Sequence, residues 1–407
     1  MAIGIKIFST MQNKINKSIL VFLVITYFSF SLIAQEQSLK TSFIFPFQEL
    51  HVHSSSIIEL PNGDMMACWF EGSGERNAND VQVKGARLKK GRTEWSTPFL
   101  MADTPGQPDC NPVLFVDNNN KLILYWVVVQ ANQWENSVLK YRSSTDYSKK
   151  GAPNWDWQDV ILLKPGEEFA KTIEDSFRSM KSRNLAWAEY APRYETMVYD
   201  AAKDKKKRET GWMTRIHPVI LPSGRILLPL YSDGFNLSLI AISDDEGESW
   251  TPSLPIVGYG NIQPAIVQKK DGSLVAFMRD NGDSPGKILI STSIDDGYSW
   301  TVAEKSDIPN PGTSVDAIKL KNGNWVMVYN DLESDRYSVA VSLSDDEGKT
   351  WKCTKRLERD DSKKGSFSYP SVIQTKDGLI HASYSYRIGE DKKTIKVVTF
   401  SSEWVKG

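Results

Sequence analysis

Short runs of alternating apolar and polar residues recur along this chain and end in turn-forming residues. Residues 237–242, 273–278 and 337–342 are examples, each rich in aliphatic, aromatic or β-branched side chains. Alternation with a period of two puts the apolar side chains on one face of an extended segment, which is typical of β-strands and not of helices. The pattern predicts an all-β protein built from many short strands.

Six turns of one kind divide these runs into pairs. Five contain a Gly after Asn, Asp or Ser, and the sixth is a run of Asn, which also adopts left-handed backbone conformations. The turns are Asn62-Gly63, Asp117-Asn-Asn-Asn120, Ser223-Gly224, Asp271-Gly272, Asn322-Gly323 and Asp377-Gly378. Because such residues favour tight hairpins, the chain is predicted to repeat one hairpin unit six times.

A second motif, Ser-x-Asp-x-Gly-x-Ser/Thr-Trp, occupies residues 243–250, 293–300 and 344–351. Its spacing of about fifty residues is within the range of propeller repeats. Asp and Ser bond the nearby backbone of such a turn, and Gly supplies a positive φ. Together the two motifs predict a six-bladed β-propeller, formed as one domain by residues 35–407.

Residues from about 166 to 209 interrupt the strand pattern. Residues 169–177 and 199–208 lack the period of two and predict a partly helical insertion between blades. Long connections within a compact fold are often functional, and two roles stay open: a cap over a pocket or a contact between subunits. The basic run 203–208 is predicted to be a solvated face.

Residues 1–34 have the character of an export signal. Lys14 and Lys17 precede an apolar stretch, residues 19–34, and polar chain begins at Gln35. This order predicts a signal peptide cut after Ala34, and a periplasmic or secreted protein that leaves the membrane after cleavage. The alternative is a retained membrane anchor, because the stretch nearly reaches the minimum length that spans a bilayer.

The charge balance argues against nucleic acid as a partner. The chain has 49 basic and 50 acidic residues and a net charge of −1, whereas domains that bind nucleic acid are usually strongly basic. The sequence also carries no nucleotide-binding loop, no nucleophile elbow and no Cys/His spacing of a zinc site. Neither a metal nor a cofactor is predicted, and the oligomeric state is left open.

Arginines at the ends of predicted strands are the first candidates for a site. Arg215, Arg279 and Arg336 each interrupt an apolar run. A guanidinium in such a position binds a carboxylate or phosphate, supplied by the protein or by a ligand. For a single arginine a structural salt bridge is the more common role, but a propeller brings equivalent strands together at its axis. Arginines from several repeats therefore predict an anion site there.

The Ser-x-Asp-x-Gly-x-Thr-Trp motif is similar to the Asp box of the sialidase (neuraminidase) superfamily, and the resemblance covers residues 45–400. It implies a six-bladed propeller and an enzyme that removes a terminal acidic sugar. Asp boxes are structural turns that also occur in proteins of other function, so the site has to be compared residue by residue.

The resemblance implies roles for five residues. Arg279 and Arg336 match two members of the arginine triad that binds the substrate carboxylate, and Arg76 matches a further arginine near it. Tyr369 matches the nucleophile. Asp80 matches the general acid/base, which lies in the loop after the first hairpin and has to be protonated in the free enzyme.

Two positions depart from the superfamily pattern. His53 stands where the first arginine of the triad is expected, and it could act as a weaker anion contact or as a base. Gln263 stands where a Glu would accept the proton of the nucleophile, which an amide cannot do. Asp316 and Glu71 are the candidates to replace that Glu. These departures leave the identity of the acidic sugar open.

The sequence therefore predicts an exported exo-glycosidase that hydrolyses a terminal acidic sugar of a glycan with retention. Arginines would hold the carboxylate of the sugar, and a tyrosine nucleophile avoids bringing a second anion to the anomeric carbon. Two other functions stay open. One is a polysaccharide lyase acting on a uronate, and the other is a glycan-binding propeller without catalysis.

Overall fold

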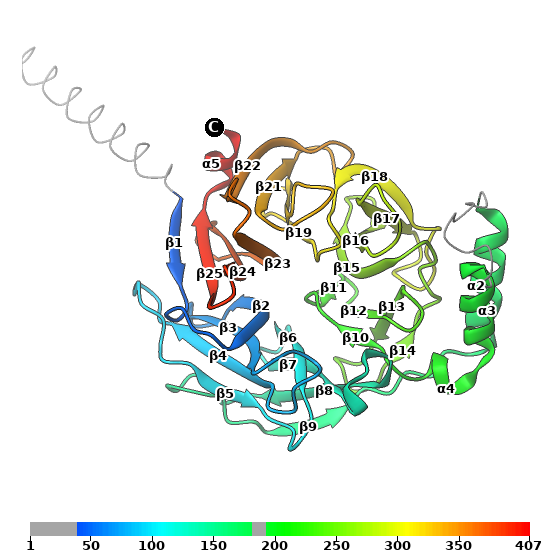
Figure 1. Cartoon of the computed structure of the whole chain (residues 1–407), viewed down its shortest axis with the longest axis horizontal. Coiled ribbons are helices and arrows are strands. Elements are labelled where there is room, and N and C mark those ends of the chain that lie inside the picture. Colours follow the sequence, from blue (N-terminus) through cyan, green and yellow to red (C-terminus); the bar gives the residue numbers. More distant parts are fainter. Residues whose placement is uncertain (1–38, 181–192) are drawn as a thin grey trace, which may run out of the picture.

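The structure, a computed structural model, describes residues 39–180 and 193–407. Its strands form six antiparallel sheets, arranged as blades around a central axis (Figure 1). Five sheets have four strands and one has five. The predicted all-β, six-bladed propeller is confirmed. The predicted signal peptide, residues 1–34, lies outside the described residues.

The blades follow one another in chain order. The first two contain β2 (His51–Glu59), β3 (Met65–Gly72), β4 (Gln82–Leu88) and β5 (Phe99–Ala102), then β6 (Asp109–Val116), β7 (Leu122–Val129), β8 (Ser137–Ser144) and β9 (Trp157–Val160). The third contains β10 (Met213–Thr214), β11 (Val219–Ile220), β12 (Ile226–Ser232), β13 (Leu237–Ser243) and β14 (Thr251–Pro252). The fourth contains β15 (Asn261–Gln268), β16 (Leu274–Asp280), β17 (Lys287–Ser293) and β18 (Glu304–Pro309). The fifth contains β19 (Asp316–Lys319), β20 (Trp325–Tyr329), β21 (Ser338–Ser344) and β22 (Lys352–Arg359).

The sixth blade joins the two ends of the ring. It contains β23 (Gly365–Gln374), β24 (Ile380–Ile388) and β25 (Lys392–Phe400), and its outermost strand is β1 (Lys40–Phe43). Strand β1 runs antiparallel to β25, with Lys40 opposite Thr399. This pairing closes the propeller with a strand from the beginning of the described chain, and a short helix, α5 (Ser402–Lys406), follows β25.

The six predicted turns all connect the strand nearest the axis to its neighbour in the same blade. Gly63, Gly224, Gly272, Gly323 and Gly378 have φ between 84° and 92°, which a residue with a side chain rarely adopts. Asn120 takes φ 61° in the remaining turn. The residues that predict hairpin turns in the sequence therefore form these turns in the fold.

Most central strands are buried on both faces, so the alternation seen in the sequence understates their burial. Every residue of β7, β12, β13 and β21 is buried. The reason is that neighbouring blades pack face to face: Met66 and Cys68 of the first blade share one apolar cluster with Leu124 and Trp126 of the second. At some positions where the alternating pattern predicts an exposed polar side chain, a small Ser is buried between blades, as at Ser238.

Each Asp box is closed by its own carboxylate. Asp346 accepts hydrogen bonds from the Ser344 hydroxyl at 2.8 Å, the Thr350 amide at 2.9 Å and the Thr350 hydroxyl at 2.6 Å. Asp245 and Asp295 accept the same three bonds in their boxes. Three donors on one carboxylate fix the turn between the third and fourth strands of a blade.

The Asp346→Asn variant is expected to lose stability at neutral pH and to match the wild type in acid. Hydrogen bonds, first that of the Thr350 side chain, lower the pKa of Asp346 from 3.8 to about 2. A carboxylate with a depressed pKa stabilises the fold above its unfolded pKa, and this stabilisation is lost as the pH falls through the folded pKa. Urea unfolding from about pH 5 to 2 measures it. A difference between the two proteins that stays constant over this window would contradict the prediction.

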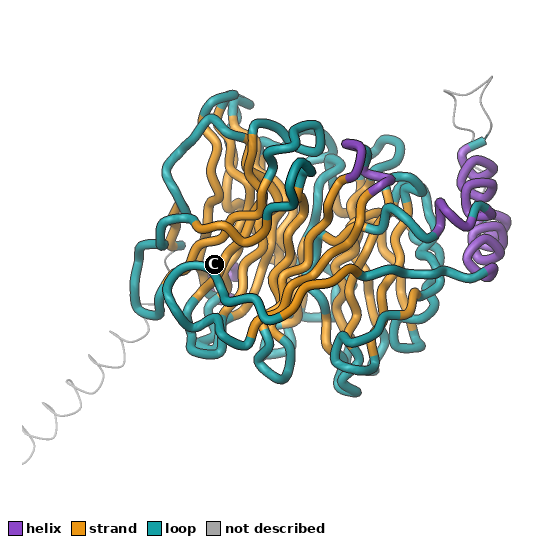
Figure 2. The backbone as a smooth tube through the Cα atoms, turned by 90° about the horizontal axis from the view of Figure 1, so that it is seen from below, coloured by secondary structure: helices purple, strands orange, loops and turns teal. Residues whose placement is uncertain are grey.

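The insertion between the second and third blades is helical, as expected. It contains α2 (Glu167–Ser179), α3 (Tyr194–Lys203) and α4 (Lys205–Arg208), which stand at the outer rim of the ring and not over its axis (Figures 1 and 2). Arg208 is buried and donates to the Pro165 carbonyl and the Glu167 carboxylate. The expectation that the whole run 203–208 is solvated is therefore wrong at Arg208, which anchors α4 to the start of α2.

Residues 39–180 and 193–407 contain neither a membrane-spanning helix nor a cluster of metal ligands. No helix in these ranges is both long and apolar enough to cross a membrane. The same part of the chain has no cluster of three or more His, Cys, Asp or Glu that could hold a metal ion.

Candidate functional site

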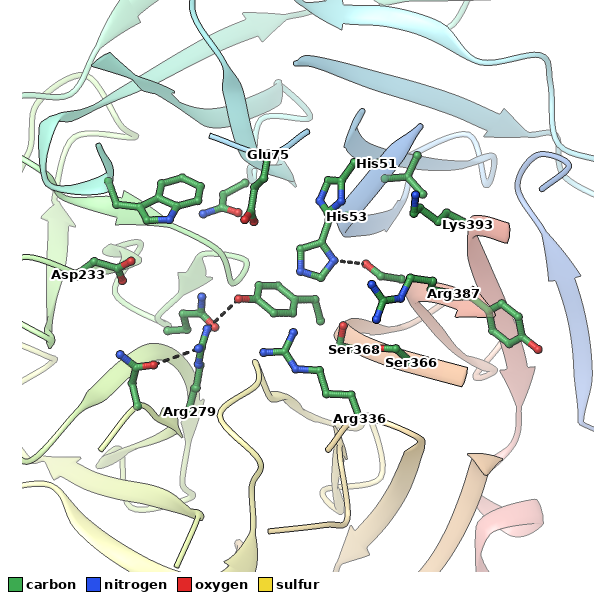
Figure 3. Close-up of a pocket in the computed structure, with 18 of the residues that line it drawn as sticks. His51, His53, Glu75, Asp233, Arg279, Arg336, Ser366, Ser368, Arg387 and Lys393 are labelled. Atoms are coloured by element: carbon green, nitrogen blue, oxygen red, sulfur yellow. Dashed lines mark hydrogen bonds between the residues drawn. The ribbon is translucent and has the colours of Figure 1, made fainter. Parts of the chain in front are cut away.

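A cavity of about 520 Å³ lies at the axis, and residues from all six blades line it (Figure 3). Its volume is in the range of sites for small molecules. Each blade contributes at least one side chain: His53, Asn111, Tyr231, Gln263, Arg336 and Tyr369. Of the site residues predicted from the sequence, five line this cavity: His53, Gln263, Arg279, Arg336 and Tyr369.

Four of the strands nearest the axis share a β-bulge next to the cavity. The pairing register shifts in β2, β6, β15 and β23, and each shift contains one residue with positive φ. These residues are Ser54 (58°), Asn111 (50°), Gln263 (59°) and Tyr369 (58°). Such a backbone costs about 1 to 3 kcal/mol per residue and persists where the surrounding structure enforces it. The bulges turn Asn111, Gln263 and Tyr369 toward the cavity.

Tyr369 is the centre of this arrangement. Its hydroxyl accepts a hydrogen bond of 2.8 Å from Arg279 Nη1. The guanidinium carbons of Arg215 and Arg336 lie 5.1 and 5.7 Å from the centre of its ring. The His53 ring packs against it with 4.1 Å between centroids. Positive charge thus surrounds the phenol on several sides, which favours any negative charge that develops on its oxygen.

Two acidic residues face these cations. Figure 3 shows Glu75 across the cavity from Arg279 and Arg336, and Asp233 on the side away from Arg387. Desolvation by burial raises the pKa of Glu75 and of Asp233, and nearby arginines oppose the shift. Glu75 is half-buried whereas Asp233 is exposed to solvent, so desolvation acts more strongly on Glu75. A carboxyl that holds its proton in this way can act as a general acid.

Within residues 39–180 and 193–407, no carboxylate forms an ion pair with His53 or a hydrogen bond with Gln263. Burial, followed by the charges of neighbouring groups, holds the pKa of His53 well below its ordinary value, which favours the neutral imidazole. Its Nδ1 is 2.8 Å from the Ser385 hydroxyl. His53 therefore does not supply the positive charge that the expected arginine would carry. The amide oxygen of Gln263 is buried and has no hydrogen-bond partner among the residues that the structure describes.

Arg215 and Asp316 lie beneath the cavity and not in its lining. Arg215 is buried and donates 3.0 Å to the Pro370 carbonyl, the residue after Tyr369. Asp316 accepts 2.7 Å from the Val372 amide, and its other oxygen is 3.5 Å from His217 Nδ1. Both residues hold the segment that carries Tyr369. They are positioning residues, and Asp316 is not in contact with the Tyr369 hydroxyl.

Three further predicted residues are not brought to the cavity lining. Asp80 is exposed, and its carboxylate accepts hydrogen bonds from the amide and the hydroxyl of Ser73. These bonds hold the loop between β3 and β4. Glu71 accepts 3.1 Å from the Trp69 indole. Arg76 stacks over Trp134, with 5.6 Å from its guanidinium carbon to the ring centre. Trp134 does line the cavity, and the charge of Arg76 opposes the rise that burial causes in the pKa of Glu75, so Arg76 lies beside the site.

The sequence comparison missed Glu75, Asp233 and Arg387, which all line the cavity. Glu75 precedes Arg76 in the loop that was singled out for Asp80, so the loop was found and the acid within it was not. Asp233 follows the buried strand β12, in the same way that Arg279 ends an apolar run. A polar residue directly after a buried strand therefore marks the cavity for acids as well as for arginines.

A family model described as the BNR repeat-like domain matches residues 63–214 and 211–382. The chain belongs to the BNR repeat-like family. The two matches follow the repeated blades seen in the structure, and the three Asp boxes lie within the second match.

Relatives of this BNR repeat-like protein include sialidases. The anhydrosialidase of Macrobdella decora is 25% identical over 192 residues, which are 40% of this chain and 23% of that protein. The chain thus spans about a quarter of the length of this relative. The solved leech intramolecular trans-sialidase superposes with a TM-score of 0.67 at 14% identity, covering 90% of this chain and 71% of that one. The intramolecular trans-sialidase from Ruminococcus gnavus gives 0.65 at 13% identity, covering 90% and 98%. The predicted sialidase-like propeller is confirmed at the level of fold.

Proposed function

We propose that this BNR repeat-like protein is a glycoside hydrolase of the sialidase type, which removes a terminal acidic sugar from a glycan with retention of configuration. The observation that carries the proposal is the Tyr369 hydroxyl, bonded to Arg279 within a cavity that also holds Arg336 and the carboxyl group of Glu75. Because its relatives are named as sialidases, sialic acid is the first candidate for the sugar. Export by residues 1–34 is part of the proposal.

The proposed reaction begins with the carboxylate of the sugar between Arg279 and Arg336, since a guanidinium binds a carboxylate bidentately. The Tyr369 phenol gives its proton to water, and its oxygen attacks the anomeric carbon and forms a glycosyl–tyrosine bond, while Glu75 gives its proton to the oxygen of the departing alcohol. Water then attacks the same carbon, Glu75 takes the proton of the water, and Tyr369 leaves as a phenolate, which regains its proton from water. Two inversions at one carbon give retention.

The proposal assigns the acid/base role to Glu75 in place of Asp80. Glu75 lines the cavity and its pKa is raised by burial, whereas the carboxylate of Asp80 is taken up by Ser73 outside the cavity. Gln263 cannot accept the proton of Tyr369, so the activation of Tyr369 depends on the surrounding guanidinium groups of Arg215, Arg279 and Arg336.

Turnover of fluorogenic aryl glycosides tests the function. Release of the fluorophore is expected from the glycoside of an acidic sugar, with N-acetylneuraminic, ketodeoxynonulosonic and uronic acid as the series, and not from the neutral galactoside. Proton NMR of the first product formed is expected to show the anomer that the substrate had. Inversion, or hydrolysis of the neutral glycoside alone, would contradict the proposal.

A uronate lyase is the second candidate, and the neutral His53 beside Tyr369 is the observation that favours it. Such a lyase removes a proton next to the carboxylate and leaves an unsaturated sugar. The two reactions are separated by the near-ultraviolet absorbance of the product, which rises for elimination only. Binding of the sugars without any product would support the glycan-binding alternative.

A further inference from the structure

One side of the cavity carries cations that the proposed reaction does not use. Arg387 of β24 stands directly opposite Lys393 of β25, and Ser366 of β23 stands opposite Arg387 on its other side. All three side chains line the cavity and form a row across the sixth blade (Figure 3). Like charges at directly opposed positions of two antiparallel strands destabilise the pairing. The sheet therefore carries a local cost at this row.

The protein does not neutralise these two charges. Within residues 39–180 and 193–407, no carboxylate lies within ion-pair distance of Arg387 or Lys393. The Lys393 ammonium donates to a backbone carbonyl, that of Glu49, at 2.7 Å. Lys396, on the same strand as Lys393, does have an acid, Glu358. The row is thus a positive surface that is open to a ligand.

His51 adds a buried polar atom on the same side. It lines the cavity near Lys393 in Figure 3, and its Nε2 atom is buried without a hydrogen-bond partner in the described structure. Burial, followed by the charges of Lys393 and Arg387, lowers the pKa of His51 to about 4. A neutral imidazole can donate one hydrogen bond to an anion held between the two cations.

We propose that Arg387, Lys393 and His51 form a second anion subsite, which binds the carboxylate of the sugar next to the terminal one. The substrate class is then a glycan with two consecutive acidic sugars. This inference rests on the proposed function, in which Arg279 and Arg336 already hold the carboxylate of the terminal sugar beside Tyr369. After burial, the charge of Arg387 is among the causes that lower the pKa of Arg336, so the row adjoins the arginines of the terminal sugar and the two carboxylates would occupy neighbouring positions (Figure 3).

The test compares disialic acid, whose second sugar is acidic, with sialyllactose, whose second sugar is neutral. The wild type is expected to have the lower KM for disialic acid. The Arg387→Ala variant is expected to raise that KM by about 10-fold, the effect of one charge-assisted hydrogen bond, and the KM for sialyllactose by less than about 2-fold. Lys392→Ala is the matched control, since Lys392 is an exposed cation on the same hairpin outside the cavity lining.

Equal losses on both substrates would overturn the subsite, because Arg387 would then act on the terminal sugar. No loss on either would overturn it as well. Calorimetric binding of both oligosaccharides to the Tyr369→Phe protein separates this inference from the proposed function. If the wild type turns over neither sugar, the proposed function fails. The subsite is still supported if disialic acid binds more tightly than sialyllactose and Arg387→Ala abolishes this difference.

Discussion

Replacing Tyr369 by Phe is expected to lower kcat on acidic aryl glycosides by at least about 10³-fold, the scale on which loss of a nucleophile acts. The substitution removes only the oxygen that Arg279 binds at 2.8 Å. The ring contacts with His53 and Arg215 remain, so the bulge in β23 and the fold are expected to persist. Initial rates give the loss of activity, and thermal unfolding shows that the protein is folded.

Tyr384→Phe is the matched control for this experiment. Tyr384 lies in the same blade, is buried, and donates its hydroxyl hydrogen to Glu358 outside the cavity. The control is expected to lose about 1 kcal/mol of stability through that hydrogen bond and to keep its kcat. A Tyr369→Phe protein with undiminished activity would remove Tyr369 from the mechanism, and the arginines around it would then need another explanation.

The Glu75→Gln variant is expected to lose about 10²-fold to 10⁴-fold in kcat on natural oligosaccharides, the usual contribution of general acid catalysis. Aryl glycosides with acidic phenols as leaving groups are expected to lose much less, because these phenols depart without a proton. Rates on the two substrate types measure the difference. A similar loss on both would show that Glu75 binds the sugar and does not act as the acid.

The pH dependence follows from the same residue. Burial, the largest cause, raises the pKa of Glu75, so the protonated form that donates persists to higher pH than for an exposed Glu. Activity on oligosaccharides is therefore expected to fall as the pH rises through that pKa, and this alkaline limb should be absent in Glu75→Gln. Asp80→Asn is the control from the same loop and is expected to keep the limb, since Asp80 bonds Ser73 outside the cavity. Loss of the limb in Asp80→Asn alone would reverse the assignment.

The fold could be predicted because its signals are local. Each hairpin requires residues that tolerate positive φ, such as Gly63 and Gly378, and each Asp box satisfies its carboxylate within eight residues. The burial of both strand faces could not be read in the same way. It depends on which blade packs against which, as for Cys68 and Trp126, and this is a property of the closed ring.

Residues of the site could be predicted where they lie in a strand, at a fixed number of positions from a turn. Arg279, Gln263 and Tyr369 satisfy that condition, and all three line the cavity. Loop residues do not, because the sequence does not state which way a loop side chain points. Glu75 and Asp80 are five positions apart in one loop, and only the folded chain separates the residue that faces the cavity from the one that caps the loop.

The pairing of strands that closes the ring determines when, during synthesis, the sheet that contains Tyr369 is complete. Strand β1 completes the sheet that contains Tyr369. It is the first described strand to be synthesised, but it can pair only after β25, one of the last strands, has been made. Joining segments so distant in the chain is slow, because a long loop has to be closed first. The blade that carries Tyr369 is therefore assembled at the end of folding. A nascent or truncated chain that lacks β25 is expected to have five blades in place and an incomplete cavity around Tyr369.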